Sequence, residues 1–263
     1  MRYLHLDVFT DRPLEGNQLA VFTTPPPDID ARLMQRIAAE MNFSESTFIF
    51  PRQTHGDVRM RIFTPGEELP IAGHPTIGST FALAAEGVIT AGRQEFVFEL
   101  GVGPTPVSLE WKEGRLDFAW MTQPLPSFQT EIEPRALVSS FGINESDALP
   151  PFPAQVISCG VPFLFVPLAS RAAVDRVTLD RRAYVAACQK AGIKELPVFM
   201  FTPDRQGASG DETVYSRMLA PGFGITEDPA TGSASGPLGC YLARHGVVDS
   251  ARARSFVSLQ GVA

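Results

Sequence analysis

The sequence predicts an α+β protein that contains two copies of one domain. Two stretches recur at nearly the same offset along the chain, which indicates an internal repeat. In each copy, short apolar runs with strand-like alternation are separated by amphipathic runs of helical periodicity, a pattern typical of α+β domains. A length of 263 residues suffices for two domains of ordinary size.

The first recurring stretch is a motif with the pattern R-x-x-x-P-G, a short loop and [HD]-P-x-x-G-S. One copy reads Arg61-Ile-Phe-Thr-Pro65-Gly66 and then His74-Pro75-Thr76-Ile77-Gly78-Ser79. The other reads Arg217-Met-Leu-Ala-Pro221-Gly222 and then Asp228-Pro229-Ala230-Thr231-Gly232-Ser233. The loops between the two halves of the motif differ slightly in length, as loops in repeats commonly do.

A second match lies upstream of each motif. Asp30 opens the amphipathic stretch ARLMQRIAAEM, and Glu45 precedes the apolar run TFIF. Asp180 opens RRAYVAACQKAG, and Glu195 follows at the same spacing before PVFMF. We therefore predict domains at residues 1–122 and 123–263, with the proline-rich stretch Gln123–Pro134 as the linker.

In the first copy, the pattern predicts a helix from its N-cap Asp30 to Met41 and another from about Pro75 to Glu86. The predicted strands are Tyr3–Thr10, Leu19–Phe22, Thr47–Phe50, Arg59–Phe63, Glu95–Leu100, Pro106–Trp111 and Leu116–Met121.

In the second copy, helices are expected near Asp180–Ala191 and Pro229–His245, the latter with Gly246 as its C-cap. Only one strand, Phe256–Val262, fits after the last helix. We therefore expect the second domain to lack about two strands that its twin possesses, and the chain to be part of a longer protein.

Composition excludes several classes of function. The net charge of −7 argues against nucleic acid as a partner, because non-specific binding to phosphates needs a clustered positive field. No apolar run is long enough to span a membrane, and the N-terminus has no signal pattern. The three cysteines are too few and too widely spaced for a disulfide framework or a zinc site. These features predict a soluble, cytoplasmic protein.

His74 and Asp228 occupy equivalent places in the repeated motif, each directly before a proline. Because proline is favoured at the first helical position, we expect both residues to be helix N-caps. Helix N-termini attract anions, so two such ends facing one cleft would hold a carboxylate-bearing substrate and stabilise an enolate-like intermediate. Asp228 could equally be an ordinary cap, whereas histidine is not a preferred cap.

Glu45 is the third candidate, since it lies where a helix gives way to an apolar strand. Partial desolvation there would raise the pKa of the carboxyl group and suit it to act as a base near neutrality. Alternatively, it is a polar residue in a turn. Its counterpart Glu195 stands between Lys194 and Pro197, so a site that uses Glu45 would be asymmetric.

Other kinds of site find no support in the sequence. Gly232-Ser-Ala-Ser-Gly236 has alanine where a serine hydrolase needs its nucleophile, and no G-x-G-x-x-G opens a helix. Histidines 5, 55, 74 and 245 form no pair at metal-ligand spacing, so no metal is expected.

Four segments resemble the PhzF family of phenazine-biosynthesis isomerases. They are Glu15-Gly-Asn-Gln-Leu-Ala-Val-Phe22, Met41-Asn-Phe-Ser-Glu-Ser46, Ala72-Gly-His-Pro75 and Glu227-Asp-Pro-Ala-Thr-Gly-Ser-Ala234. The resemblance runs from Asp7 to Val262. It implies the diaminopimelate epimerase-like fold, in which each of two similar domains curls a mixed or antiparallel sheet around a central helix, with the active site between them.

The resemblance also implies cofactor-free proton transfer on trans-2,3-dihydro-3-hydroxyanthranilate, a carboxylated cyclohexadiene. Glu45 matches the residue that takes a proton from one ring carbon and returns it to another. His74, Asp228 and Ser44 match residues that surround the substrate and assist proton movement. Gly73, Gly232 and Ser233 match positions that contact its polar groups. A homodimer is implied as well. Gln18 departs from the proline of the family's G-N-P motif, a change we expect to be mild.

The leading hypothesis is therefore a cofactor-independent isomerase of a small, carboxylated, cyclic substrate, with Glu45 as acid and base. A racemase or epimerase that uses Glu45 and Asp228 on opposite faces of an amino-acid-like substrate is an alternative. A non-catalytic binding protein of the same fold is another, although the presence of Glu45 and His74 disfavours it.

Overall fold

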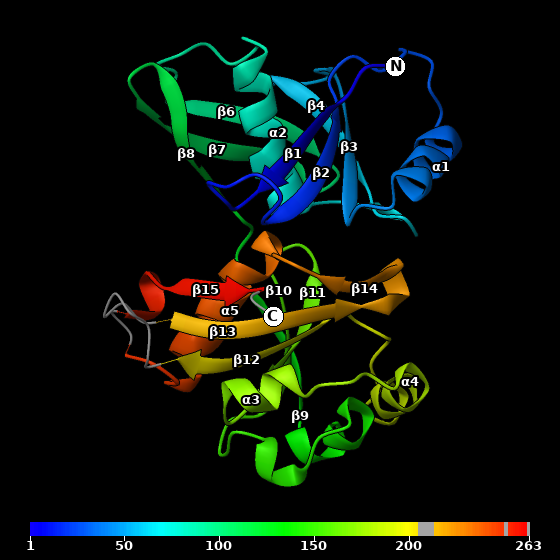
Figure 1. The fold of residues 1–263 in the computed structure, drawn as a ribbon, viewed down its shortest axis with the longest axis vertical. Helices are drawn as coiled ribbons and strands as arrows, with labels where there is room; N and C mark the ends of the chain where they lie inside the picture. The colour runs from blue at the N-terminus through cyan, green and yellow to red at the C-terminus, as the bar shows by residue number, and fades with distance from the viewer. Residues whose placement is uncertain (205–212, 250–251, 262–263) are drawn as a thin grey trace. The chain divides into compact units, whose positions relative to one another are not determined.

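The computed structural model describes residues 1–204, 213–249 and 252–261, and the chain divides into two compact units (Figure 1). Unit 1 comprises Met1–Pro124 and unit 2 comprises Leu125–Ala263. Each unit contains a large sheet and a long helix, as the repeat predicts.

Unit 1 has an eight-stranded mixed sheet. Its strands are β1 (Leu4–Val8), β2 (Asn17–Phe22), β3 (Glu45–Pro51), β4 (Val58–Phe63), β5 (Glu68–Leu69), β6 (Glu95–Leu100), β7 (Gly103–Lys112) and β8 (Arg115–Met121). The order is β1-β2-β3-β4-β6-β7-β8, with β5 paired to β4. The pairs β2–β3 and β4–β6 are parallel, and the other pairs are antiparallel.

The helix α2 (Gly73–Ala85) packs against β1, β2, β3 and β8, so the sheet curls around it (Figure 1). Gly78 makes this close approach possible, because a Cβ there would lie 2.5 Å from Leu19 Cδ2 and 2.7 Å from Val8 Cγ2. The lack of a side chain at Gly78 therefore serves helix–sheet packing.

The second helix of unit 1, α1 (Ala31–Met41), has Asp30 as its N-cap, whose side chain accepts from Leu33 N at 2.7 Å. Its buried residues Met34 and Ala38 pack with the phenylalanines of β2, β3 and β4. The predicted cap and helix are confirmed, because the apolar stripe of an amphipathic helix and an aspartate cap are both local signals.

Unit 2 repeats the arrangement. Its strands are β9 (Ser127–Ile132), β10 (Ala154–Ser158), β11 (Pro162–Pro167), β12 (Val198–Asp204), β13 (Thr213–Ala220), β14 (Ile225–Asp228) and β15 (Val257–Gln260). Its α-helices are α3 (Arg171–Asp175), α4 (Arg181–Lys190) and α5 (Gly232–His245). Short 3-10 helices occupy Pro134–Ala136, Val138–Phe141, Glu145–Asp147, Pro221–Phe223 and Arg252–Arg254.

The two sheets correspond strand by strand around the repeated motif. The order in unit 2 is β14-β13-β12-β11-β10-β9, with β15 paired to β13. β13 pairs antiparallel with β12 and β14 and parallel with β15, just as β4 pairs with β3, β5 and β6. The crossover β11–β12 is parallel, like β2–β3. The prediction of two copies of one α+β domain is confirmed.

Two local predictions need correction or restriction. The stretch Gln123–Pro134 is not simply a linker, because it contains β9, which pairs with β10. Its prolines flank the strand and do not interrupt its hydrogen bonds. Of the predicted strand Phe256–Val262, β15 occupies the middle, and Val262 lies outside the described residues.

The predicted N-caps are also wrong. Ala72 caps α2 and Thr231 caps α5, so His74 is the second residue inside its helix, while Asp228 ends a strand before its helix begins. The C-cap prediction for Gly246 is confirmed by its left-handed conformation, with φ of 62°.

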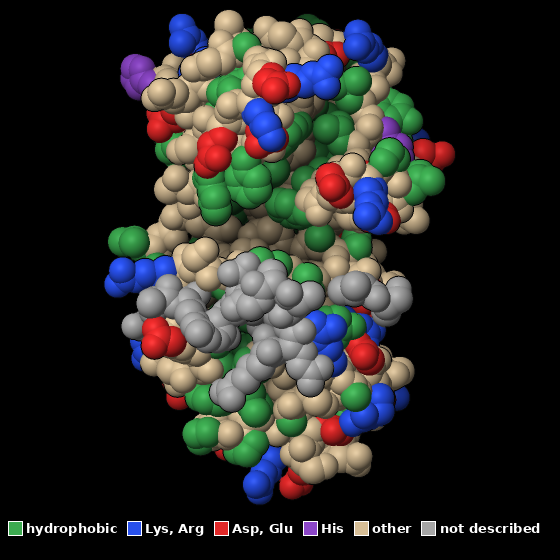
Figure 2. Space-filling view, turned by 60° about the vertical axis from the view of Figure 1, so that its left-hand side comes forward, with side chains coloured by type: hydrophobic (Ala, Val, Ile, Leu, Met, Phe, Trp, Pro, Cys, Tyr) green, Lys and Arg blue, Asp and Glu red, His purple; other side chains and the backbone are tan. Residues whose placement is uncertain are grey.

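Charged side chains of both signs are interspersed on the surface shown in Figure 2. Hydrophobic side chains also reach the surface of unit 1, and Phe118 and Trp120 of β8 are 48% and 59% exposed. Among the described residues, no helix combines the length and apolarity that a membrane span requires.

Candidate active site

Glu45 is the first residue of β3 and lies opposite Leu19 of the parallel strand β2. Its exposed fraction is only 8%, since the strand that follows is buried almost throughout. Glu45 is therefore part of a strand and not of a turn, and its carboxyl group is largely withdrawn from water. Ser44, the residue before it, is half-buried.

His74 lies in the first turn of α2 and is 3% exposed. Its Nδ1 atom is 3.1 Å from Glu45 Oε2 and 3.3 Å from Asn17 Nδ2. Its Nε2 atom is 3.2 Å from the carbonyl oxygen of Gln18. The start of α2, the start of β2 and the start of β3 thus bring one buried polar group together.

These contacts determine the tautomer of His74. A carbonyl oxygen only accepts hydrogen bonds, so Nε2 carries a hydrogen and donates it to Gln18. Burial lowers the pKa of His74 to about 3, although the Gln18 carbonyl opposes this shift. The ring is therefore neutral at physiological pH, and Nδ1 presents a lone pair toward Glu45 and Asn17.

The contact with Gln18 also explains why glutamine can replace the proline of the G-N-P motif without loss of this hydrogen bond. The atom that contacts His74 is the backbone carbonyl, which any residue supplies, while the Gln18 side chain is exposed. The substitution thus leaves this contact in place.

The other unit 1 candidates have different surroundings. Gly73 is the buried first residue of α2. Ser79 is fully buried, and its Oγ is 3.0 Å from Thr47 Oγ1 of β3. Ser79 and Gly78 therefore hold α2 against the sheet and do not open its backbone to a ligand.

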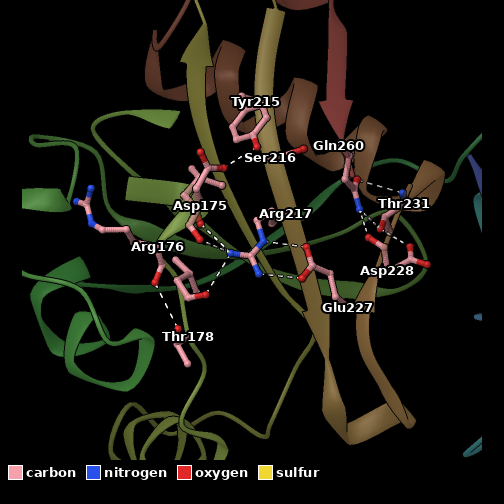
Figure 3. A network of polar contacts seen from close by, with 12 residues as sticks. Asp175, Arg176, Thr178, Tyr215, Ser216, Arg217, Glu227, Asp228, Thr231 and Gln260 are labelled. Carbon is pink, nitrogen blue, oxygen red and sulfur yellow. Dashed lines mark hydrogen bonds and ion pairs between the residues drawn. The ribbon is translucent and has the colours of Figure 1, made fainter. Parts of the chain in front are cut away.

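In unit 2, Asp228 is the last residue of β14 and is 3% exposed. The Thr231 hydroxyl donates to Asp228 Oδ2. Gln260 of β15 donates from Nε2 to the Asp228 carbonyl oxygen at 2.7 Å, as Figure 3 shows. Gly232 and Ser233, half-buried, form the first turn of α5 directly after this loop.

Arg217 of β13 anchors the hairpin that carries Asp228. Its Nε and Nη2 atoms each donate to Glu227 at 2.8 Å, in a bidentate pair (Figure 3). Its Nη1 atom donates to the carbonyl oxygens of Val174, Asp175 and Val177, at the end of α3. The arginine of the repeated motif is therefore structural, and it fixes the strand next to the candidate residue.

The structure thus brings Glu45 and His74 together in unit 1, while Asp228 belongs to unit 2. Their partners were not predicted from the sequence: Asn17 and the Gln18 carbonyl for His74, and Thr231 and Gln260 for Asp228. Asn17 stands just before the apolar run Leu19–Phe22, in a segment that carries the family resemblance, and this position was a usable signal. No local signal existed for Gln260, whose partners are distant in the sequence. Within the described part of the chain, no cluster of three or more His, Cys, Asp or Glu residues could hold a metal ion.

Comparison with solved structures identifies the fold. The chain superposes on a PhzF-family phenazine biosynthesis protein from Bacillus anthracis with a TM-score of 0.79 and 26% identity, over 92% of this chain and 79% of that one. It also superposes on a probable proline racemase from Agrobacterium radiobacter K84 with a TM-score of 0.64 and 13% identity, over 94% and 78% of the two chains. The fold is diaminopimelate epimerase-like, as expected.

Sequence comparison gives the family. The profile described as Phenazine biosynthesis-like protein, PhzC-PhzF, matches residues 6–263, and the chain belongs to this family. It is 39% identical over 244 residues to the trans-2,3-dihydro-3-hydroxyanthranilate isomerase of Pseudomonas aeruginosa, over 93% of this chain and 80% of the relative. The same-named enzyme of Pseudomonas chlororaphis is 36% identical over 247 residues, or 94% and 81%. These relatives place the chain among the isomerases.

Proposed function

We propose that this isomerase moves a proton between two carbons of a small, carboxylated, cyclic substrate without a cofactor. The observation that carries the proposal is the buried pair of Glu45 Oε2 and His74 Nδ1, 3.1 Å apart. The names of the relatives support trans-2,3-dihydro-3-hydroxyanthranilate as the substrate.

In the proposed reaction, the Glu45 carboxylate takes a proton from one ring carbon. The electron pair of the broken C–H bond delocalises over the conjugated system toward the substrate carboxylate. The protonated Glu45 then returns the proton to a second ring carbon, so that atoms and charge balance. The partial positive charge at a helix N-terminus would stabilise the transient anion.

His74 suits a supporting role in this cycle. Because its pKa is lowered to about 3, it does not remove the proton from Glu45, which must keep that proton for the return step. While Glu45 is a carboxylate, the neutral Nδ1 accepts from Asn17 Nδ2; once Glu45 is protonated, Nδ1 can accept from its carboxyl group and so fix the rotamer of Glu45. Ser44 and Gly73 flank this pair in the sequence and are the proposed contacts for polar groups of the substrate.

We further propose that Asp228, Gly232 and Ser233 of unit 2 act on the same substrate. The support is the sequence motif, in which Asp228 aligns with His74, although Asp228 pairs with Met218 in the sheet as Leu69 pairs with Ile62. Buried and hydrogen-bonded by Thr231, Asp228 would assist proton movement as an acceptor.

The test is turnover of trans-2,3-dihydro-3-hydroxyanthranilate in H₂O and in D₂O by wild type and Glu45→Gln. We expect the variant to lose about 10³-fold in kcat, since its amide cannot take the proton. Glu40→Gln, at an exposed position of α1, is the matched control and should retain full activity. Full activity of Glu45→Gln would refute the assignment.

The same assay separates the alternative reaction. Two buried carboxylates, Glu45 and Asp228, would also suit a racemase or epimerase with one acid on each face. Such an enzyme would leave the double bonds in place and invert one stereocentre. A shifted double bond in the product therefore supports the isomerase, whereas stereoinversion alone supports the alternative.

A homodimer and a cytoplasmic location stay predictions.

A further inference from the structure

Gln260, the last residue of β15, is joined to the loop that runs from Asp228 to the start of α5. Its Nε2 donates to the carbonyl oxygen of Asp228 at 2.7 Å and to Thr231 Oγ1 at 2.9 Å. Its Oε1 accepts from Thr231 N at 3.1 Å. Figure 3 shows the three bonds converging on the two ends of the loop.

These bonds use both hydrogens of the side-chain amide and one of the two lone pairs of Oε1, and they fit one orientation of the amide only. Both hydrogens of Nε2 point to oxygen atoms of the loop, and a flipped amide would place Oε1 against those same oxygens. The amide orientation is thus determined by its partners.

The orientation of Gln260 also determines that of the Thr231 hydroxyl group. Thr231 Oγ1 accepts a hydrogen from Gln260, so its own hydrogen is directed at Asp228 Oδ2. The result is a chain of bonds from amide to hydroxyl to carboxylate, in which Asp228 Oδ2 is the final acceptor.

Gly261 supplies a second, independent contact with the same loop. Its φ is 70°, and a Cβ there would lie 2.6 Å from the carbonyl oxygen of Pro229. The backbone of the loop therefore rests directly against the chain that leaves β15, and only glycine permits this approach.

The twin unit shows that the amide is not a requirement of the fold. The strand β6 pairs with β4 as β15 pairs with β13, and it ends in Leu100-Gly101. A Cβ at Gly101 would lie 2.8 Å from Cα of Pro70, in the loop before α2, so the glycine contact is repeated. The side chain of Leu100, however, cannot donate a hydrogen bond. The amide is confined to the unit that carries Asp228.

We propose that Gln260 is a positioning residue for Asp228. It fixes the loop from Asp228 to Thr231 and directs the Thr231 hydroxyl at Oδ2, so that Asp228 is presented to the substrate as a hydrogen-bond acceptor in a single orientation. This inference rests on the role proposed above for Asp228.

The experiment compares Gln260→Leu, which installs the residue of the twin unit, with Thr231→Val and the double variant. In the assay with trans-2,3-dihydro-3-hydroxyanthranilate, each single variant should lose about 10- to 100-fold in kcat with little change in KM. The double variant should lose little more than either single variant, because both changes break the same chain of bonds. If the losses in kcat of the two single variants add up in the double variant, the two residues do not act through one series of hydrogen bonds.

The matched control is Gln155→Leu. Gln155 also makes several side-chain bonds in the sheet of unit 2, to Gln129, Glu131 and His245, but none to the loop of Asp228. If Gln155→Leu lowers kcat as much as Gln260→Leu, the effect is a general loss of stability and the proposal is wrong. Exchange of the Thr231 amide hydrogen should be faster by about tenfold or more in Gln260→Leu and unchanged in Gln155→Leu.

Asp228→Asn distinguishes failure of the inference from failure of the proposed function. If Asp228→Asn is fully active, the proposed role of Asp228 is refuted, and the positioning role of Gln260 is refuted as well. If Asp228→Asn is inactive while Gln260→Leu is as active as wild type, only the positioning role is overturned. Inactivity of Asp228→Asn together with a selective kcat loss in Gln260→Leu supports both.

Discussion

Glu45 and Glu195 follow their helix caps at the same spacing, but they are not structural counterparts. Met200 pairs with Arg217 as Phe48 pairs with Arg61, so Pro197 occupies the place of Glu45 in unit 2. Glu45 is buried beside the neutral ring of His74. Glu195 instead accepts two hydrogen bonds from Arg181, at 2.8 and 3.0 Å, at the start of α4. The Glu195 carboxylate is engaged by a charged guanidinium group, whereas the Glu45 carboxyl group faces a neutral imidazole. The two glutamates therefore differ in chemistry because of their neighbours, His74 and Arg181.

Burial of His74 predicts a pH dependence of stability. Because its folded-state pKa of about 3 lies below the usual value of 6.5, the unfolded chain binds more protons between these values. The contribution to stability is complete above pH 6.5 and is lost at roughly 1.4 kcal/mol per pH unit as the pH falls toward 3. His74→Gln should therefore show a shallower decline in the free energy of unfolding between pH 6.5 and 4 than wild type.

Fluorescence suits this measurement, since both tryptophans, Trp111 and Trp120, belong to unit 1, which also holds His74. Urea unfolding at a series of pH values gives the slope. His55→Gln, at an exposed position of the same unit, is the control and should match wild type. An unchanged slope in His74→Gln would show that the ring is not held neutral.

At the scale of elements, each unit uses one arginine of the repeated motif to hold the short strand before its long helix. Arg61 donates to both carboxylate oxygens of Glu68, at 2.7 and 2.6 Å, and links β4 to β5. Arg217 makes the equivalent pair with Glu227 and in addition binds three carbonyl oxygens at the end of α3. The motif was predicted from the sequence as part of a binding site, but its arginine instead stabilises the fold in each unit.

Lysine cannot reproduce this geometry, because its single ammonium group lacks the planar fork of arginine. We expect Arg217→Lys to lower the free energy of unfolding by about 2 kcal/mol or more, since it leaves buried carbonyl groups without their donor. Arg61→Lys should cost less, because it loses only a partly exposed pair. Circular dichroism during urea unfolding compares the two, and equal losses would contradict the role assigned to the α3 contacts.

The loop between β3 and β4 is held by Glu99 of β6. Its carboxylate accepts from the backbone N–H groups of Gln53, Thr54 and Gly56 and from the Thr54 hydroxyl group. The Thr54 hydroxyl is the main cause that lowers the pKa of Glu99 to about 2, and the backbone donors add to it.

A lowered carboxyl pKa implies stability that is present above pH 4.5 and lost as the pH falls toward 2. Glu99→Gln should unfold at lower urea concentration than wild type at pH 7, and this difference should narrow between pH 4.5 and 3. Tryptophan fluorescence again reports on the unit concerned. Glu95→Gln, exposed on the same strand, should differ little from wild type at either pH. A constant difference for Glu99→Gln across this range would argue against the ionised clamp.

At the scale of the whole molecule, the repeat duplicates the scaffold but not the chemistry. Both units contain the amphipathic helix with an aspartate cap, the arginine–glutamate hairpin and the glycine that contacts a proline before the long helix. Only unit 1 has the pair of Glu45 and His74, and only unit 2 has the amide of Gln260 beside an aspartate. The two units therefore carry different polar groups on similar scaffolds.

This asymmetry predicts unequal effects of the same substitution at Glu45 and at Glu195. Glu195→Gln should retain kcat within about twofold of wild type and lose at most about 1 kcal/mol of stability, because its pair with Arg181 is partly exposed. Glu45→Gln should lose activity with little effect on thermal unfolding of unit 2. Assays of the two variants side by side test this, and a comparable loss of kcat in Glu195→Gln would contradict the asymmetric site.

The sequence by itself determined the repeat, the α+β class and the helices that begin at Asp30 and Asp180. Those features depend on periodicity, on caps and on turn residues, all of which act over a few neighbouring positions. The same local reasoning misplaced the two N-caps and read β9 as a linker, because whether a strand forms between prolines depends on the partner strand it meets.

Only the tertiary structure decided which polar groups meet. The contacts of His74 with Asn17, Gln18 and Glu45 require that β2, β3 and α2 begin at one place, and this follows from the parallel register of β2 and β3. The contact of Gln260 with Asp228 likewise follows from the pairing of β15 with β13. Hydrogen bonds between residues distant in the chain depend on strand register and on the closure of a sheet around its helix, and no local pattern encodes either.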